Sequence, residues 1–473
     1  MALSAETTFT ELFSFCAPKS ACTDGNQPLG GLTQATNGDL YGTTSFGGAN
    51  GDSGTVFKIT PSGALMTLYS FCAESGCVDG SNPWAGLVQA TNGDLYGTTH
   101  SGGANLQGTL FKITPSGALT TVYSFCAESE CTDGSEPQAG LVLAANGDLY
   151  GTTWSGGAIG GGSVFKISNS GKYTTVYSFC SKRSPPNVCM DGVNPLGGLV
   201  IAASGELYGT TSDGGAGYGT IFKLTTDGAL TTLYSFCSQV NCNDGYYPRG
   251  ALVQATNGDF YGTTSFGGAN GRGTVFKITP SGVLTTLHSF CAETNCTDGE
   301  EPLAGLVLAT DGNLYGVTTT SGAKHDHHGT VFKITPSGKL TTLHTFCSQT
   351  KCADGDYAAA VLFQATNGTF YGTTQFGGAH GDLAGTLFSL SVGLGPFVEI
   401  ESTSGKAGKL VTILGTDLAG ATRVSFNGTA AEFNVLSTTE ITATVPAGAT
   451  TGKLTVVTPG GTLESNVRFI VLP

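Results

Sequence analysis

Residues 68–117 read LYSFCAESGCVDGSNPWAGLVQATNGDLYGTTHSGGANLQGTLFKITPSG. Similar stretches recur along the chain with a period of about 54 to 57 residues, and seven copies can be counted. A unit of this size cannot bury its own apolar face, so neighbouring copies must pack on one another. The repeat therefore predicts one architecture for most of the chain.

Each copy contains four short runs of β-prone residues, which in this copy are 86–90, 94–99, 108–114 and 119–125. Asn92-Gly93-Asp94 and Pro115-Ser116-Gly117 lie between these runs. Both are hairpin turn sequences, because Asn and Gly accept positive φ and Pro presets a turn. Four antiparallel strands in every repeat are typical of β-propeller blades.

The two ends of the repeat array indicate a closed ring. Residues 8–15 match only the fourth strand of the unit, whereas the seventh copy stops after its third strand at 385–390. If the N-terminal strand completes the last blade, no open edge remains at the seam. We therefore predict an all-β fold in which residues 1–392 form a seven-bladed β-propeller closed by the N-terminal strand.

The 14 cysteines form seven close pairs, one in each repeat. The pairs are Cys16 and Cys22, Cys72 and Cys77, Cys126 and Cys131, Cys180 and Cys189, Cys237 and Cys242, Cys291 and Cys296, and Cys347 and Cys352. No pair has the Cys-x2-Cys spacing typical of zinc sites, so we predict local disulfides. Disulfides indicate an oxidising compartment and therefore export from the cell.

The composition limits the classes of partner. The chain has 473 residues, a formal net charge of -14 and only 11% charged residues. An acidic chain without a basic patch argues against a nucleic-acid partner. No apolar run is long enough to cross a bilayer, so no membrane span is predicted. The oligomeric state is left open.

A second structural unit follows the repeats. From Gly395 the repeat pattern ends, and residues 396–473 alternate between short strand-like runs and turns. This pattern predicts a small immunoglobulin-like β-sandwich. If chain direction alternates from strand to strand, this unit should lie on the side of the ring that carries the Asn-Gly and Pro-Ser-Gly turns.

The repeat resembles the bacterial GloVer tandem-repeat proteins over residues 8–392, through Asn-Gly-Asp-Leu-Tyr-Gly-Thr-Thr, Gly-Gly-Ala and Gly-Thr-Val-Phe-Lys-Ile-Thr. Residues 396–473 resemble an IPT/TIG domain, through Val411-Thr412-Ile413-Leu414-Gly415 and Val424-Ser425-Phe426-Asn427-Gly428. These resemblances imply an exported bacterial protein, either extracellular or on the cell surface. They imply no catalytic residue.

Features that every blade shares are best explained by the ring itself. One is an aspartate before glycine in each disulfide loop, at Asp24, Asp79, Asp133, Asp191, Asp244, Asp298 and Asp354. We expect these residues to cap turns. Calcium is an alternative, although each site offers one carboxylate where calcium prefers six to eight oxygens.

Specific binding should arise where blades differ on the disulfide-loop side. Aromatic residues there could stack on sugar rings, with polar neighbours bonding hydroxyl groups. The candidate ligand-binding residues are Trp84, Trp154, Tyr247, Phe266 and Gln375, with Tyr246 beside them. We therefore predict recognition of a polysaccharide or cell-surface glycan. Ordinary packing of these aromatic residues beneath long loops is the alternative.

A polysaccharide lyase or glycoside hydrolase on the same side is a second hypothesis. Its catalytic candidates are His100, Asp213, Tyr246 and Arg249, which only a central pocket could bring together. A third hypothesis is a structural surface or filament component with neither binding nor turnover.

A histidine cluster in blade six suggests a transition-metal site. Its ligands would be His325, Asp326, His327 and His328, with His380 from the adjacent blade. A solvated polar insertion is the alternative. The cofactor therefore stays open between calcium, a transition metal and none.

Overall fold

The computed structural model describes residues 7–17, 22–184, 188–202, 204–320, 328–381 and 383–472. In these described residues the only helical elements are short 3-10 turns, and every other regular element is a strand. The all-β prediction is therefore confirmed. No helix in this part of the chain has the length and apolar character needed to span a bilayer.

The described part of the repeat region forms seven four-stranded antiparallel sheets, called here blades one to seven in chain order. The first strands are β2 Thr33–Gln34, β6 Val88–Gln89, β10 Val142–Leu143, β16 Val200–Ile201, β20 Val253–Gln254, β24 Val307–Leu308 and β28 Phe363–Gln364. The second strands are β3 Leu40–Thr44, β7 Leu95–Thr99, β11 Leu149–Thr153, β17 Leu207–Thr211, β21 Phe260–Thr264, β25 Leu314–Val317 and β29 Phe370–Thr374.

The other two strands complete each blade. The third strands are β4 Thr55–Ile59, β8 Thr109–Ile113, β12 Ser163–Ile167, β18 Thr220–Leu224, β22 Thr274–Ile278, β26 Thr330–Ile334 and β30 Thr386–Ser391. The outer strands are β5 Leu65–Ser70, β9 Leu119–Ser124, β13 Tyr173–Ser178, β19 Leu230–Ser235, β23 Leu284–Ser289, β27 Leu340–Thr345 and, in blade seven, β1 Thr8–Ser14.

Two glycines show how tightly the blades are packed. A Cβ atom on Gly97, in the second strand of blade two, would lie 2.6 Å from the ring of Phe111 in the third strand. Just before the first strand, a Cβ atom on Gly86 would lie 2.4 Å from the carbonyl oxygen of Gly31 in blade one. Glycine is therefore needed where a phenylalanine ring crosses the sheet and where neighbouring backbones meet around the axis.

The phenylalanine of each Phe-Cys pair links one blade to the next. Phe71, at the end of blade one, is fully buried and packs edge-on against Phe111 of blade two, with ring centroids 5.1 Å apart. In the described residues the same contact recurs between Phe15 and Phe57, Phe125 and Phe165, Phe179 and Phe222, Phe236 and Phe276, Phe290 and Phe332, and Phe346 and Phe388. One aromatic contact thus joins every blade to its neighbour.

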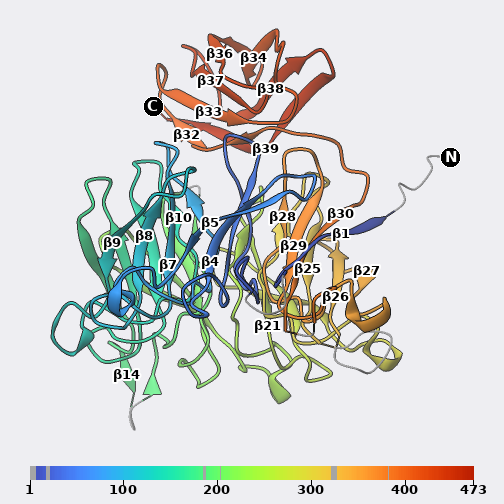
Figure 1. The fold of residues 1–473 in the computed structure, drawn as a ribbon. Helices are drawn as coiled ribbons and strands as arrows, with labels where there is room; N and C mark the ends of the chain where they lie inside the picture. The colour runs from blue at the N-terminus through green and yellow to red at the C-terminus, as the bar shows by residue number, and fades with distance from the viewer. Residues whose placement is uncertain are drawn as a thin grey trace.

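The N-terminal strand closes the ring. β1 pairs antiparallel with β30, with Thr8 opposite Ser391 and Ser14 opposite Thr386. Figure 1 shows β1, in blue, beside β30, in orange. Phe15 then continues from β1 into the Phe15–Phe57 contact with blade one. The prediction that the N-terminal strand completes the last sheet is confirmed.

All seven predicted disulfides are present, and they lie in the loops that connect one blade to the next. The end of the ring that carries them is called the disulfide face, and the opposite end the turn face. Most of these loops contain a 3-10 turn: η1 Ser75–Cys77, η2 Ser129–Cys131, η3 Val240–Cys242, η4 Thr294–Cys296 and η5 Thr350–Cys352. The loop into blade four instead contains a hairpin of β14 Arg183–Ser184 and β15 Val188–Cys189.

An aspartate organises each disulfide loop and is buried in all of them except the loop into blade one, where Asp24 is half-buried. Asp79 accepts hydrogen bonds from the Tyr69 hydroxyl and the Ala73 amide, both at 2.9 Å, and from the Glu74 amide at 3.2 Å. Its side chain is almost fully buried. Each of the seven aspartates accepts a hydrogen bond from a backbone amide of its loop, so their predicted turn-capping role is confirmed. Among the described residues, Asp24 Oδ1 and Asp191 Oδ1 have no hydrogen-bond partner.

Two histidines take over the role of the tyrosine in this network. His288 and His344 replace tyrosine at the end of the outer strand and place Nε2 2.9 Å and 3.2 Å from the carboxylates of Asp298 and Asp354. These histidines hydrogen bond the capping aspartate because the ring nitrogen reaches the position of the tyrosine hydroxyl.

The turn face is held by charge pairs and carries the C-terminal unit. Lysines of the third strands lie 2.8–3.8 Å from an acidic residue of the neighbouring turn in blades one to six. This residue follows the turn glycine in blades one to five, whereas Asp311 precedes it in blade six. Blade seven has Ser389 and Thr369 at these two positions. There the chain continues toward the C-terminal unit, and a Cβ atom on Gly368 would lie 2.3 Å from the carbonyl oxygen of Leu394.

The C-terminal unit consists of two sheets that enclose one apolar core. The first sheet contains β31 Glu399–Ile400, β33 Leu410–Leu414, β37 Glu440–Thr444 and β36 Phe433–Val435. The second contains β32 Ser404–Gly405, β39 Gly461–Val471, β38 Gly452–Thr458, β34 Arg423–Phe426 and β35 Thr429–Ala431. Fully buried residues of both sheets, such as Ile413 and Leu454, form the core between them.

The C-terminal unit contacts the turn face, as alternation of chain direction predicted. The Thr439 hydroxyl donates to the Thr36 carbonyl at 2.6 Å, and the hydroxyls of Thr366 and Thr416 lie 2.9 Å apart. Figure 1 shows this unit, in orange and red, at the end of the ring opposite β14. The disulfide face is therefore on the side away from the C-terminal unit.

Replacing Asp354 with Asn should destabilise the fold by about 1–3 kcal/mol, because buried donors lose a charged acceptor. Burial pushes the pKa of Asp354 up, but hydrogen bonds from His344, Ser348 and the Gln349 amide outweigh burial and lower the pKa from 3.8 to about 2. Because the folded-state pKa is the lower one, this carboxylate stabilises the fold above pH 3.8, and the contribution disappears as the pH falls toward 2. Denaturant unfolding at pH 7 and pH 2 measures both effects.

Asp24→Asn is the matched control for this prediction. Burial raises the pKa of Asp24, and its carboxylate accepts a hydrogen bond from the Ala17 amide at 3.1 Å. We expect a smaller loss of stability and none of the acid dependence seen for Asp354. Equal effects of the two substitutions would contradict the capping argument.

Replacing Phe15 with Ala should cost about 3–5 kcal/mol of unfolding free energy, because it removes a buried aromatic ring at the seam between blades seven and one. Chemical denaturation monitored by far-UV circular dichroism provides the measurement. The neighbouring Phe13 is only half-buried, so Phe13→Ala should cost clearly less. A loss below about 1 kcal/mol for Phe15→Ala would show that closure does not depend on this contact.

Candidate functional site

The disulfide face brings together two variable loops of each blade. The residue after the Asp-Gly of the disulfide loop pairs with the second residue after the second strand, as in the bridges between Tyr246 and Phe266 and between Val193 and Asp213. The carbonyl of the next residue, Tyr247 in blade five, accepts a hydrogen bond from the Ser265 amide at 3.1 Å. Positions about 20 residues apart in the sequence thus become neighbours on the surface.

Four aromatic rings gather where blades four and five meet. Tyr246 contacts Tyr247, Phe266 and Tyr218, with centroid distances of 5.2, 5.7 and 5.6 Å. Tyr247 also packs edge-on against Phe266 at 6.2 Å. Tyr218 is 40% exposed, and the other three rings are half-buried. These four residues, called the aromatic cluster, combine predicted ligand-binding residues with Tyr218, which sequence reasoning missed.

The contact between Tyr218 and Tyr246 belongs to a pattern between successive blades, called here the interblade pair. It joins the residue two positions before the third strand of one blade, such as Tyr218 before β18, to the residue after the Asp-Gly of the next disulfide loop, such as Tyr246. Arg272 forms an ion pair with Glu300 at 3.1 Å in this position, and His328 lies 3.0 Å from Asp356.

The interblade pairs divide the disulfide face into two halves. Large or charged residues occupy them from blade four to blade seven, whereas the remaining pairs are small or uncharged. These are Ala384 with Asn26, Ser53 with Ser81, Gln107 with Ser135, and Gly161 with Val193. Comparing the copies at these two positions would have shown the asymmetry from the sequence.

Arg249 influences Tyr357, which belongs to blade seven. Burial raises the pKa of Tyr357, as does the charge of Glu301, whereas Arg249 and a hydrogen bond with Thr319 act in the opposite direction. Arg249 of blade five is therefore close enough to influence a phenol in blade seven. Arg249 itself is exposed, so a charged guanidinium is available to a ligand on the disulfide face.

A second group forms on blades two and three. The rings of Trp84 and His100 stack with centroids 4.1 Å apart and an interplanar angle of 10°. Burial lowers the pKa of His100, while the charge of Glu136 acts in the opposite direction. In the described part of the chain, Trp84 Nε1 and His100 Nδ1 have no hydrogen-bond partner. The Trp154 amide donates to the Glu136 carbonyl at 3.2 Å, which places Trp154 beside this group.

The other predicted residues have separate neighbours. Asp213 accepts a hydrogen bond from the Ser212 hydroxyl at 2.7 Å, and Gln375 donates to the side-chain oxygen of Gln27 at 3.2 Å. No contact among the described residues joins His100 to Asp213. The proposed catalytic set of His100, Asp213, Tyr246 and Arg249 is therefore not brought together by direct contacts, and catalysis stays a prediction.

The predicted metal site is only partly visible. His325, Asp326 and His327 lie outside the described residues. His328 faces Asp356, whereas the charge of His380 acts on Asp24. Cys347 and Cys352 lie near His328, but their disulfide leaves no thiolate to bind a metal. The metal site stays a prediction.

Three solved structures show distant similarity to this chain. A putative 6-phosphogluconolactonase from Bacteroides uniformis matches with 14% identity and a TM-score of 0.42, over 66% of this chain and 83% of its own. A putative oxidoreductase (glucose dehydrogenase) from Thermus thermophilus matches with 14% identity and a TM-score of 0.39, over 81% and 100%. A protein of unknown function from Bacteroides thetaiotaomicron matches with 12% identity and a TM-score of 0.38, over 76% and 95%. Scores this low carry no argument about activity.

Family models match both parts of the chain, although no curated protein does. A Gloeobacter/Verrucomicrobia repeat matches at residues 2–189, 186–353 and 294–420, which together span most of the sequence. An IPT/TIG domain matches at residues 397–471. Both predicted resemblances are therefore confirmed. The chain belongs to the Gloeobacter/Verrucomicrobia repeat family and carries an IPT/TIG domain after its repeats.

Proposed function

We propose that this is an exported bacterial protein whose disulfide face binds a glycan, with sugar rings stacking on the aromatic cluster. The observation that carries the proposal is the convergence of Tyr218, Tyr246, Tyr247 and Phe266 from two blades. Flat aromatic surfaces suit the C–H faces of sugars, and the phenol hydroxyls bond sugar hydroxyls.

The polar groups around the cluster fit a polysaccharide, whose surface alternates between apolar ring faces and polar hydroxyl groups. Arg249 is exposed, and Arg272 is 50% exposed while its guanidinium pairs with the buried Glu300. Such charged groups offer directional hydrogen bonds to a ligand on the disulfide face. The net charge of -14 favours a neutral glycan over a strongly acidic one, because like charges repel.

Export is supported by the covalent chemistry of the repeats. Each disulfide loop contains one disulfide, and a chain with seven of them suits an oxidising environment. In this proposal the IPT/TIG domain occupies the turn face and leaves the glycan-binding face free.

Replacing Tyr218 or Tyr247 with Ala should weaken binding to the recognised glycan about tenfold, equivalent to roughly 1.4 kcal/mol, because each removes an aromatic stacking surface. The measurement is calorimetric titration or affinity electrophoresis with a panel of neutral plant, algal and bacterial polysaccharides. New reducing ends or unsaturated uronates in the same mixtures would instead favour the enzyme hypothesis.

Phe46→Ala is the matched control. Phe46 occupies in blade one the position of Phe266 in blade five, but Asn26 and Gln27 stand where blade five has two tyrosines. We expect this variant to retain wild-type affinity. Equal loss in Phe46→Ala, or binding to none of the panel, would count against the proposal.

A further inference from the structure

A cavity of about 260 Å³ lies between the inner strands of the propeller and the IPT/TIG domain. Blades one, two, three and seven contribute walls, and so do β31 and β33 of the C-terminal unit. Its lining includes Thr33, Val88, Gln89, Leu143, Phe363 and Leu414, together with two glutamates. The cavity is partly open, so a small solute can reach it.

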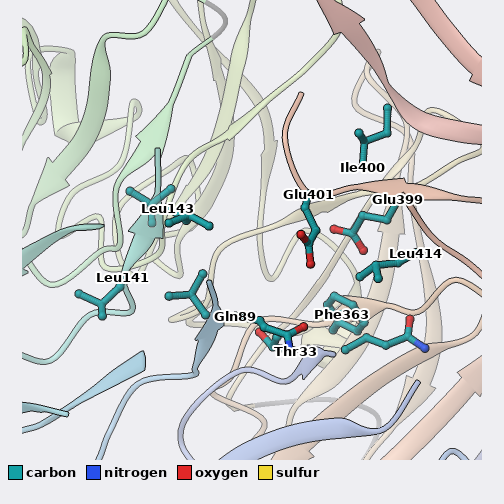
Figure 2. A pocket seen from close by; sticks show the side chains of 12 residues that line it. Thr33, Gln89, Leu141, Leu143, Phe363, Glu399, Ile400, Glu401 and Leu414 are labelled. Atoms are coloured by element: carbon teal, nitrogen blue, oxygen red, sulfur yellow. The ribbon is translucent and has the colours of Figure 1, made fainter. Parts of the chain in front are cut away.

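Both glutamates project into this space because of strand alternation. Val398 and Ile400 point into the core of the C-terminal unit, so Glu399 and Glu401 lie on the opposite side of the same strand segment. Figure 2 shows their carboxyl groups directed toward one another and toward the inner strands of the propeller. Glu399 is half-buried and lines the cavity.

The polar groups of the propeller wall already have partners. The Thr33 hydroxyl donates to the Leu87 carbonyl at 2.6 Å. The side-chain oxygens of Gln34 and Gln89 accept hydrogen bonds from the amides of Thr366 and Thr36, both at 3.0 Å. None of the described lining residues is cationic. In the described chain no hydrogen bond or ion pair is formed by the Glu399 carboxyl group, which lines a cavity of mixed polar and apolar surface.

The two carboxyl groups are poised to change charge near neutral pH. Burial raises the pKa of Glu399 to about 7. Burial also raises that of Glu401 to about 7, assisted by the charges of Glu440 and Glu399 and opposed by a hydrogen bond with Thr412. No other titratable group lines the described cavity. When both carboxyl groups are ionised, their negative charges repel each other in surroundings that contain no positive group. A cation between them would offset this repulsion.

We propose that this cavity is a binding site for a small organic cation, an alkylammonium whose charged group lies between Glu399 and Glu401. Its hydrocarbon part would pack on Val88, Leu143 and Phe363. The proposal stands on two independent observations, which are the cavity itself and the unpartnered carboxyl group aimed into it. Calcium fits less well, because the wall oxygens that could complete its coordination are engaged in hydrogen bonds.

Calorimetric titration of the full chain with n-butylammonium chloride tests this proposal. We expect saturable binding, and n-butanol, which has the same chain without the charge, should not bind. A carboxyl group with a pKa of about 7 is roughly ten times more ionised at pH 8 than at pH 6. The affinity for butylammonium should therefore rise about tenfold between these pH values.

Glu399→Gln should weaken butylammonium binding at pH 8 at least about tenfold, as expected for loss of a buried charge-assisted hydrogen bond. Glutamine resembles the protonated glutamate, so the variant is expected to fold, and its thermal unfolding at pH 6 checks this. Glu432→Gln is the control, because Glu432 is exposed elsewhere on the C-terminal unit. It should bind as the wild type does.

Three results would overturn the proposal: no binding of butylammonium at pH 8, equal binding of butanol, or unchanged affinity in a folded Glu399→Gln variant. Binding of calcium chloride without binding of butylammonium would also overturn it in favour of a metal site. The cavity lies on the turn face, so failure here leaves the glycan proposal on the disulfide face untouched.

Discussion

The edge-on contact between one phenylalanine at the end of each blade and another in the third strand of the next is the interaction on which the structure depends. Each ring, such as Phe71 against Phe111, is fully buried. Every blade contributes one phenylalanine to the contact with the next blade and another to the contact with the preceding blade. All of these contacts can therefore form only when the ring is closed. Phe15 makes this contact across the seam, which explains why the N-terminal strand must join the last blade.

A ring built from near-identical contacts leaves its loops free to vary. The disulfide and the buried aspartate hold each loop to the end of its own blade, as Asp79 does with Tyr69 and the Ala73 amide. The interblade pair then changes without disturbing the blade below, from small residues between blades one and four to Tyr218 with Tyr246 and Arg272 with Glu300. Asymmetry for binding is thereby confined to the surface of a symmetric scaffold.

On the turn face, one blade differs from the others where the C-terminal domain is attached. Blade seven lacks the lysine and the acidic residue that pair in the other blades, having Ser389 and Thr369 instead, and the chain toward the IPT/TIG domain passes close to its turn. Hydrogen bonds through Thr36 and Thr366 seat the domain there. Covering this face partly buries Glu399 and Glu401, and this burial is the main cause of their raised pKa values.

Local pattern was enough to determine the strands, the disulfides, the closure and the face to which the C-terminal unit attaches. Each of these depends on spacing within one repeat or on chain direction, and both can be read along the sequence. The neighbours of individual side chains were decided only by tertiary structure. Tyr218 contacts Tyr246 across a blade boundary, His288 makes the hydrogen bond that a tyrosine makes elsewhere, and Glu399 lines a cavity shared with the inner strands of the propeller. These contacts depend on how separate sheets pack against one another, which the repeat period does not encode.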